Sequence, residues 1–136
     1  MSKMNDYENK ALLKIVGPLE LEVMKVIWTR QDATVQNVLT ELNKQNDYAY
    51  TTIMTVMNRL DKKGILTRSK VGKGYVYKPY YSPNELIQQN SSEQVEHLLH
   101  HYGDIAITQF VDAVGHNPDQ LHKLKELIQK LEQDEK

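Results

Sequence analysis

A single pair of strand-like segments interrupts a chain whose other ordered segments carry helical spacing. Residues 65–71 and 75–81 are rich in β-branched and aromatic side chains. Between them, Gly72-Lys73-Gly74 supplies the permissive backbone that a tight turn needs. We therefore expect one β-hairpin with a basic tip in a protein that is otherwise mainly α.

Three helices are expected before the hairpin. Pro18 begins the first ordered element, because proline is tolerated at the first helical position. Thr34 is suited to cap the second helix, and Gly64 to end the third. The order of three helices and a basic hairpin is typical of a winged helix-turn-helix module, which we assign to residues 1–81. The helices are expected over residues 18–30, 34–44 and 51–63.

The third helix has an unusual outward face. Its apolar residues fall within a band of roughly 100°, and the opposite side gathers Thr51, Thr55, Asn58 and Lys62, with Arg59 beside them. Threonine and asparagine are weaker helix formers than the residues of an ordinary solvated face. Hydroxyl, amide and guanidinium groups contact base edges when a helix enters the major groove of DNA. We interpret this face as DNA-binding, although it also suits a winged helix that binds only protein.

Charge is divided unevenly along the chain. The net charge is −1, yet residues 1–81 carry 13 Lys and Arg against 8 Asp and Glu, whereas residues 82–136 carry 4 against 10. Between residues 59 and 78, seven cations accompany a single acidic residue, Asp61. Such a patch is typical of a polyanion-binding surface, although a solvated lysine-rich face has the same composition. The hairpin residues that we assign to the DNA backbone are Arg68, Lys70, Lys73 and Tyr75.

Residues 82–136 are expected to form a helical dimerisation domain. Ser82-Pro83-Asn84-Glu85 is a specific helix start, and Asn117-Pro118 begins the last helix. The apolar stripes of these short helices must be covered, either by the first domain or by a second copy. We favour a homodimer, because two-fold association is the commonest soluble assembly. The residues assigned to the dimer interface are Leu98, Leu99, Tyr102, Phe110, Leu121, Leu124, Ile128 and Leu131.

Several classes of protein are excluded by composition and by missing motifs. The absence of cysteine excludes disulfides, thiolate metal sites and cysteine nucleophiles. No stretch approaches the roughly 18 apolar residues of a membrane span, and residues 1–10 resemble no signal peptide, so we expect a cytoplasmic protein without membrane contact. Nucleophile-elbow, P-loop and dinucleotide motifs are also missing. We therefore expect neither an enzyme nor a cofactor.

A histidine pair provides an alternative function. His97 and His101 are spaced to share a helix face, with Glu96 and His100 adjacent, and zinc can use such spacing. The order differs from H-E-x-x-H, and exposed or packed histidines are the ordinary interpretation. We predict no metal site, and a metal-responsive regulator remains the alternative. A third ligand would have to come from His116, His122 or Asp104.

Three stretches carry a family resemblance. They are L-E-L-E-V-M-x-x-I-W over residues 19–28, Y-A-Y-T-T-I-M-T-V-M-x-R-L-x-K-K-G over residues 48–64 and Y-x-Y over residues 75–77. In these motifs the chain resembles the penicillinase-repressor family, also called BlaI/MecI/CopY. The resemblance covers essentially the whole chain and is densest from Pro18 to Tyr81.

The resemblance implies a dimeric winged-helix repressor of transcription. Such a protein binds an inverted-repeat operator of the TACA…TGTA kind in double-stranded DNA and controls antibiotic-resistance or related stress and homeostasis genes. The groove-reading positions of the family fall on Thr51, Thr52, Thr55 and Arg59.

The resemblance leaves the inducing signal open. The copper-responsive branch carries a C-terminal cysteine cluster that this chain lacks. In the β-lactam branch, a membrane receptor triggers cleavage of the dimerisation region, which implies a receptor-linked protease as a partner. The scissile dipeptides of that branch end in Phe, and the only Phe here is Phe110, which follows Gln109.

Overall fold

The computed structural model describes residues 4–135, and within them it contains seven helices and one two-stranded antiparallel sheet. The fold is therefore mainly α with one hairpin, as the sequence predicts. Contacts divide the chain into an N-terminal unit up to Ser91 and a C-terminal unit from Ser92. The elements are α1 (Asp6–Ile15), α2 (Pro18–Arg30), α3 (Val35–Leu42), α4 (Tyr50–Lys62), β1 (Leu66–Val71), β2 (Gly74–Pro79), α5 (Pro83–Tyr102), α6 (Asp104–Gly115) and α7 (Pro118–Asp134).

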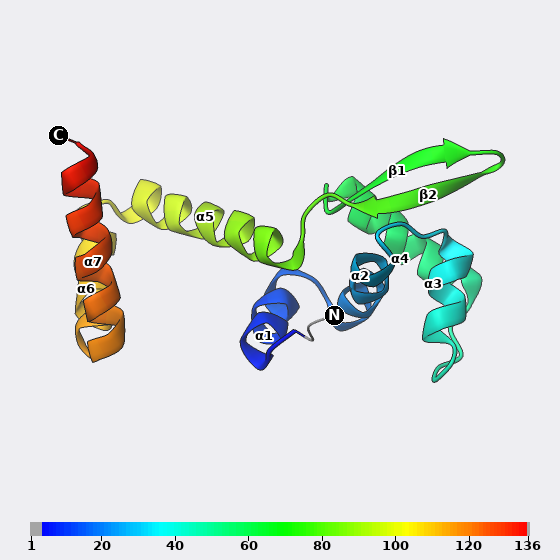
Figure 1. Cartoon of the computed structure of the whole chain (residues 1–136), viewed down its shortest axis with the longest axis horizontal. Helices are drawn as coiled ribbons and strands as arrows, with labels where there is room; N and C mark the ends of the chain where they lie inside the picture. Colours follow the sequence, from blue (N-terminus) through cyan, green and yellow to red (C-terminus); the bar gives the residue numbers. More distant parts are fainter. Residues whose placement is uncertain (1–3, 136) are drawn as a thin grey trace. The chain divides into compact units, whose positions relative to one another are not determined.

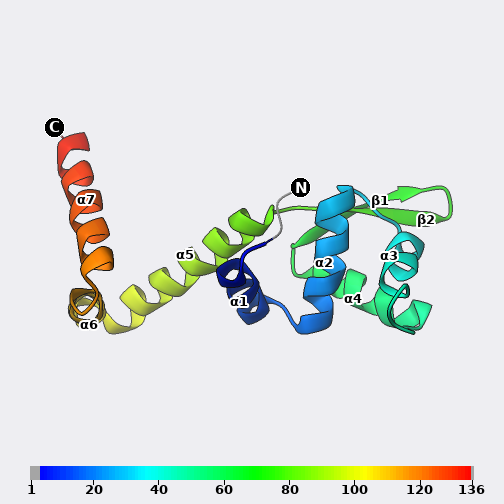
Figure 2. The same cartoon turned by 60° about the horizontal axis from the view of Figure 1, so that its bottom comes forward.

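The N-terminal unit is built around α2, α3 and α4, which pack against one another beside the hairpin (Figure 1). The same arrangement is seen from a second direction in Figure 2. Apolar side chains from all three helices, from α1 and from the hairpin form one buried cluster. Its fully buried members include Leu12, Val23, Met24, Ile27, Val38, Ile53, Met57 and Leu60.

The predicted helix starts are confirmed in this unit. Pro18 is the first residue of α2, and Thr34 caps α3, where its hydroxyl accepts a hydrogen bond from the Asn37 amide at 3.1 Å. The second helix ends two residues earlier than expected. The Asn43 side chain exchanges two hydrogen bonds with the Tyr48 backbone, of 2.8 and 3.0 Å, and so begins the turn into α4.

The expectation that order begins at Pro18 is wrong, because α1 precedes it. The Asn5 side chain caps this helix by accepting a hydrogen bond from the Glu8 amide at 2.8 Å. Leu12 in α1 and Val16 just after it are buried in the core. Leu12 is the only residue within α1 that is buried, so this helix contributes little to the core.

The hairpin forms a wing, by which we mean β1, β2 and their turn. The strands pair from Leu66 opposite Pro79 to Val71 opposite Gly74, which leaves Gly72 and Lys73 at the tip. Gly72 has a φ of 62°, the left-handed conformation that favours glycine. The wing is also held to the helices, because Tyr77 and Ala33 exchange backbone hydrogen bonds of 2.9 and 3.0 Å.

The predicted start of α5, which lies in the N-terminal unit, is confirmed, since Ser82 and Glu85 exchange hydrogen bonds of 2.9 and 3.1 Å in a capping box.

The C-terminal unit has little core. Within it, α6 and α7 pack against each other. Among residues 92–135, only Val114 is buried. No helix in the described part of the chain is long and apolar enough to cross a membrane. The expected domain boundary after Tyr81 stays a prediction.

Candidate nucleic-acid interface

The helix α4 presents one buried side and one exposed side. Ile53, Val56, Met57 and Leu60 lie in the core, as their spacing predicts. Because these residues fix the rotation of α4 about its axis, the polar residues between them point outward. We call the exposed polar set the outer face of α4. It consists of Thr51, Thr52, Thr55, Arg59 and Lys62.

The structure brings much of this face together around one shallow hollow. Thr55, Arg59 and Lys62 line it, together with the half-buried Asn58. The Thr55 hydroxyl donates to the Thr51 carbonyl at 2.8 Å, so its proton is used within the helix. Its lone pairs and its methyl group remain available to an outside partner.

Arg59 has a partner that was not predicted from the sequence. Glu20 on α2 is only 7% exposed, and its carboxylate lies 3.6 Å from Arg59 Nη1 and 3.1 Å from Lys63 Nζ. The Arg59 side chain nevertheless stays 54% exposed. Helical spacing could have found this carboxylate, because Glu20 stands four residues before Met24 and seven before Ile27 on the core-facing stripe.

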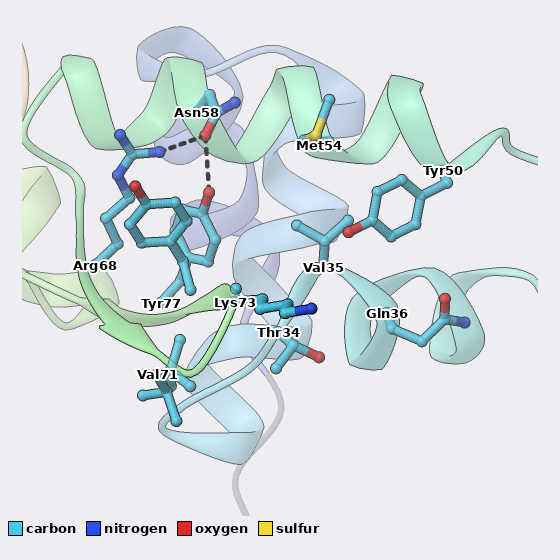
Figure 3. A pocket seen from close by; sticks show the side chains of 13 residues that line it. Thr34, Val35, Gln36, Tyr50, Met54, Asn58, Arg68, Val71, Lys73 and Tyr77 are labelled. Carbon is cyan, nitrogen blue, oxygen red and sulfur yellow. Dashed lines mark hydrogen bonds between the residues drawn. The ribbon is translucent and has the colours of Figure 1, made fainter.

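Asn58 connects α4 to the wing. Its side-chain oxygen accepts a hydrogen bond of 2.9 Å from Arg68 Nη1 and another of 2.7 Å from the Tyr77 hydroxyl (Figure 3). Tyr77 is itself buried, at 2% exposure. The carbonyl end of Asn58, expected to face DNA, is therefore committed within the protein.

Arg68 is held by several groups at once. Besides its bond to Asn58, its Nε lies 3.5 Å from the Asp61 carboxylate, and its guanidinium lies over the Tyr75 ring at 4.2 Å from the centroid. The Tyr77 side chain, followed by Tyr75 and Asp61, raises the pKa of Arg68 above its ordinary value. The guanidinium therefore stays charged and is braced from three sides.

Two other cations of the wing, Lys70 and Lys73, differ from Arg68. Lys70 on β1 and Lys73 at the tip are exposed, and within residues 4–135 neither makes a hydrogen bond or an ion pair with another side chain. Their ammonium groups are free to meet phosphates.

A groove runs between the start of α3, α4 and the wing (Figure 3). Lys73 lines it, as do Asn58, Arg68 and Tyr75, all of which were assigned to DNA from the sequence. None of the remaining lining residues was assigned to DNA, because they come from three separate segments. Among them, the start of α3 contributes Thr34 and Gln36, and α4 contributes Tyr50 and Met54.

The residues expected in the dimer interface lie on all three C-terminal helices. Leu98, Leu99 and Tyr102 on α5 and Phe110 on α6 are exposed, with Phe110 at 56%. On α7, Ile128 and Leu131 are exposed, whereas Leu121 and Leu124 are half-buried.

The histidines of α5 do not gather a metal site. The rings of His97 and His101 lie 4.0 Å apart between centroids, and His101 Nδ1 hydrogen-bonds the His97 carbonyl at 2.9 Å. His122, a candidate third ligand, pairs instead with Glu126 at 3.0 Å. The part of the chain that the structure describes contains no group of three or more side chains that could hold a metal ion.

Comparison with known proteins decides the family. The sequence profile described as penicillinase repressor matches residues 16–130, which include the whole of α2, α3, α4 and the wing. The chain belongs to the penicillinase repressor family. The family consists of repressors of transcription rather than enzymes.

Three relatives illustrate the range of the family. The penicillinase repressor of Bacillus licheniformis is 27% identical over 84% of this chain and 89% of its own length. The methicillin resistance regulatory protein MecI of Staphylococcus aureus is 25% identical over 85% of this chain and 94% of its own. The transcriptional regulator BlaI of Mycobacterium tuberculosis is 37% identical over 57% of this chain and 56% of its own.

Two solved structures of BlaI are also similar. The DNA-binding domain of the repressor BlaI is 40% identical and covers 49% of this chain and 82% of that domain, with a TM-score of 0.46. Monomeric Bacillus licheniformis BlaI with the blaP half-operator is 38% identical and covers 52% of this chain and 85% of its own, with a TM-score of 0.45.

Proposed function

We propose that this chain is a homodimeric repressor that works in the cytoplasm and binds an inverted-repeat operator in double-stranded DNA. The observation that carries the proposal is the outer face of α4. Hydroxyls, a guanidinium and an ammonium are exposed there, on a helix whose other side is fixed in the core. This chemistry suits base edges in a major groove, which admits an α-helix.

The roles of the side chains follow from their exposure. Thr51, Thr52 and Thr55 offer hydroxyl and methyl groups to base edges, and Arg59 offers a guanidinium. Lys70 and Lys73 on the wing, and Lys62 on α4, neutralise phosphates. Phosphate contacts position the protein on the duplex, and the contacts from α4 select the sequence.

Two copies would be joined through the C-terminal unit. Its exposed apolar side chains on α5, α6 and α7 support a self-complementary contact. A dimer would bring two α4 helices to half-sites about one helical turn apart or a small multiple of it. The family resemblance suggests half-sites of the TACA and TGTA kind, upstream of antibiotic-resistance or related stress genes.

Binding to two duplexes tests the proposal. One contains the TACA…TGTA inverted repeat, and the other has the same composition in scrambled order. Arg59→Ala should lower affinity for the repeat by about 10- to 100-fold, because a good contact to a base edge is worth about 1–3 kcal/mol. Thr55→Ala should have a smaller effect in the same direction. Both variants should bind the scrambled duplex nearly as the wild type does.

Thr29→Ala is the matched control. Thr29 on α2 is exposed and donates its hydroxyl to the Lys25 carbonyl at 2.9 Å, as Thr55 does to Thr51. The control should bind both duplexes normally. Equal losses on both duplexes for Arg59→Ala and Thr55→Ala would contradict base reading. Failure of the wild type to bind either duplex would indicate a winged helix used only for protein contacts.

The wing makes a separate prediction. Lys73→Ala should weaken binding to both duplexes alike and lower the slope of log affinity against log salt concentration by about one, because one phosphate contact is lost. Fluorescence anisotropy between about 50 and 200 mM salt measures this slope. An unchanged slope would remove Lys73 from the DNA interface.

The inducing partner is a further part of the proposal. By analogy with the β-lactam branch of the family, a receptor-linked protease would release the repressor by cutting the helical unit. Phe110 on α6 is the residue to examine, because it is exposed and follows Gln109. The mass of the chain isolated from induced cells would reveal cleavage after Gln109.

A further inference from the structure

We propose that Asn58 and Arg68 form a clasp that holds the wing against α4, and that Arg68 serves DNA binding as a positioning residue rather than as a phosphate contact. This inference rests on the proposed function. From the basic composition of the wing, Arg68 was expected to contact the DNA backbone. The inference gives this residue a structural role in its place.

The clasp centres on one oxygen atom. Asn58 Oδ1 accepts from Arg68 Nη1 on β1 at 2.9 Å and from the Tyr77 hydroxyl on β2 at 2.7 Å (Figure 3). Tyr77 is in turn bonded through its backbone to Ala33, ahead of α3. A single side chain of α4 therefore holds both strands of the wing at a fixed distance from the helix.

Arg68 is occupied on more than one side of its guanidinium. Nη1 is used by Asn58, Nε faces Asp61 at 3.5 Å, and one face of the group lies over the Tyr75 ring. Asp61 also neutralises part of the charge that a phosphate would meet. Lys70, two residues along the same face of β1, has none of these partners in the described structure.

The wing needs such a contact because it has little core of its own. On β1 only Leu66 is buried, and on β2 only Tyr77. Hydrogen bonds from α4 to the Arg68–Tyr77 pair therefore add to this limited apolar packing in the middle of the hairpin. A wing that is already set at the spacing of the DNA backbone loses less conformational freedom on binding. The clasp thus raises operator affinity without touching DNA.

Salt dependence separates a clasp from a phosphate contact. Arg68→Ala should lower affinity for the inverted-repeat duplex by about tenfold with the salt slope unchanged. Arg68→Lys should not restore affinity, because a lysine cannot reach both Asn58 and Asp61 with a fixed fork of donors. Lys70→Ala is the matched control, and its slope should fall by about one. A slope that falls equally for Arg68→Ala, with affinity recovered in Arg68→Lys, would overturn the proposal.

A measurement without DNA tests the contact itself. Amide hydrogen exchange of the paired wing residues should become about tenfold faster in Arg68→Ala and in Asn58→Ala. The double variant should show less than the product of the two single effects, because the bond between Asn58 and Arg68 is lost in each single variant. Exchange in Lys70→Ala should match the wild type. Unchanged exchange in both clasp variants would overturn the proposal whatever the DNA result. If the wild type bound no DNA, faster exchange would leave the clasp standing as a contact and overturn its role in operator binding.

Discussion

The two units of the chain differ in where their apolar side chains lie. In the described part of the N-terminal unit, 18 apolar residues form one buried cluster. In the described part of the C-terminal unit, Val114 alone is buried, while Phe110 and Leu131 are 56% and 65% exposed. The N-terminal unit buries most of its large apolar side chains in its own core, whereas the C-terminal unit leaves most of its large apolar side chains exposed. Under the proposed function, folding and association would be divided between two parts of one sequence.

The largest effect is expected in the N-terminal core. Leu60→Ala should lower the free energy of unfolding by about 3 kcal/mol, because Leu60 on α4 is fully buried in the core. Urea denaturation followed by circular dichroism measures this loss. Leu13→Ala is the matched control, since Leu13 is 46% exposed on α1 and should cost far less. Equal losses in the two variants would remove the distinction between core and surface.

The next largest effect is expected at the exposed apolar surface of the C-terminal unit. Leu131→Asp should leave the unfolding of the N-terminal unit unchanged and raise the dimer dissociation constant at least about tenfold, because a charge would replace an apolar contact in both copies. Sedimentation equilibrium at micromolar concentration measures the constant. Gln129→Asp, on the same helix and also exposed, is the control and should dimerise normally. A wild-type chain that is monomeric at these concentrations would contradict the assigned interface.

A smaller effect is expected where α5 begins. Ser82→Ala should lower stability by about 1 kcal/mol through loss of the capping hydroxyl. Hydrogen bonds from the Ser82 backbone and side chain lower the pKa of Glu85, so the ionised carboxylate stabilises the fold. That contribution is present above the ordinary pKa of a glutamate and is lost as pH falls through the lowered pKa.

Glu85→Gln tests this pH dependence. Its melting temperature should lie below that of the wild type at pH 7, and the two should converge as the solution is acidified past the lowered pKa of Glu85. Glu96→Gln, at an exposed position of the same helix but outside the capping box, is the control. A constant difference at all pH values would contradict a role for the charge.

The fold was largely predictable because its local signals agree with its packing. Pro18, Thr34, Gly64 and Ser82 mark helix ends by backbone chemistry that depends on neighbours in sequence. The hairpin follows from glycine at its tip. α1 escaped prediction because its place depends mainly on the burial of Leu12 by residues distant in sequence.

The candidate site was predictable in part. Helical projection identified the exposed residues of α4, since rotation about the axis follows from the apolar positions. It did not show that Arg59 faces Glu20 or that Arg68 bonds to Asn58, because each pair joins two elements. The sequence indicates which cations are present, and only tertiary contacts distinguish those that are braced from those that are free. The assignments to DNA and to the dimer interface stay predictions.

The buried carboxylate of Glu20 has a consequence for register. It meets Arg59 and Lys63, one helical turn apart near the end of α4. A slide of α4 by one residue along its axis would be about 1.5 Å and would misalign both cations. The contacts of Glu20 on α2 with these two cations therefore help to fix the position of α4 along its own axis. In the proposed complex, this contact inside the protein would determine which base pairs the threonines can reach.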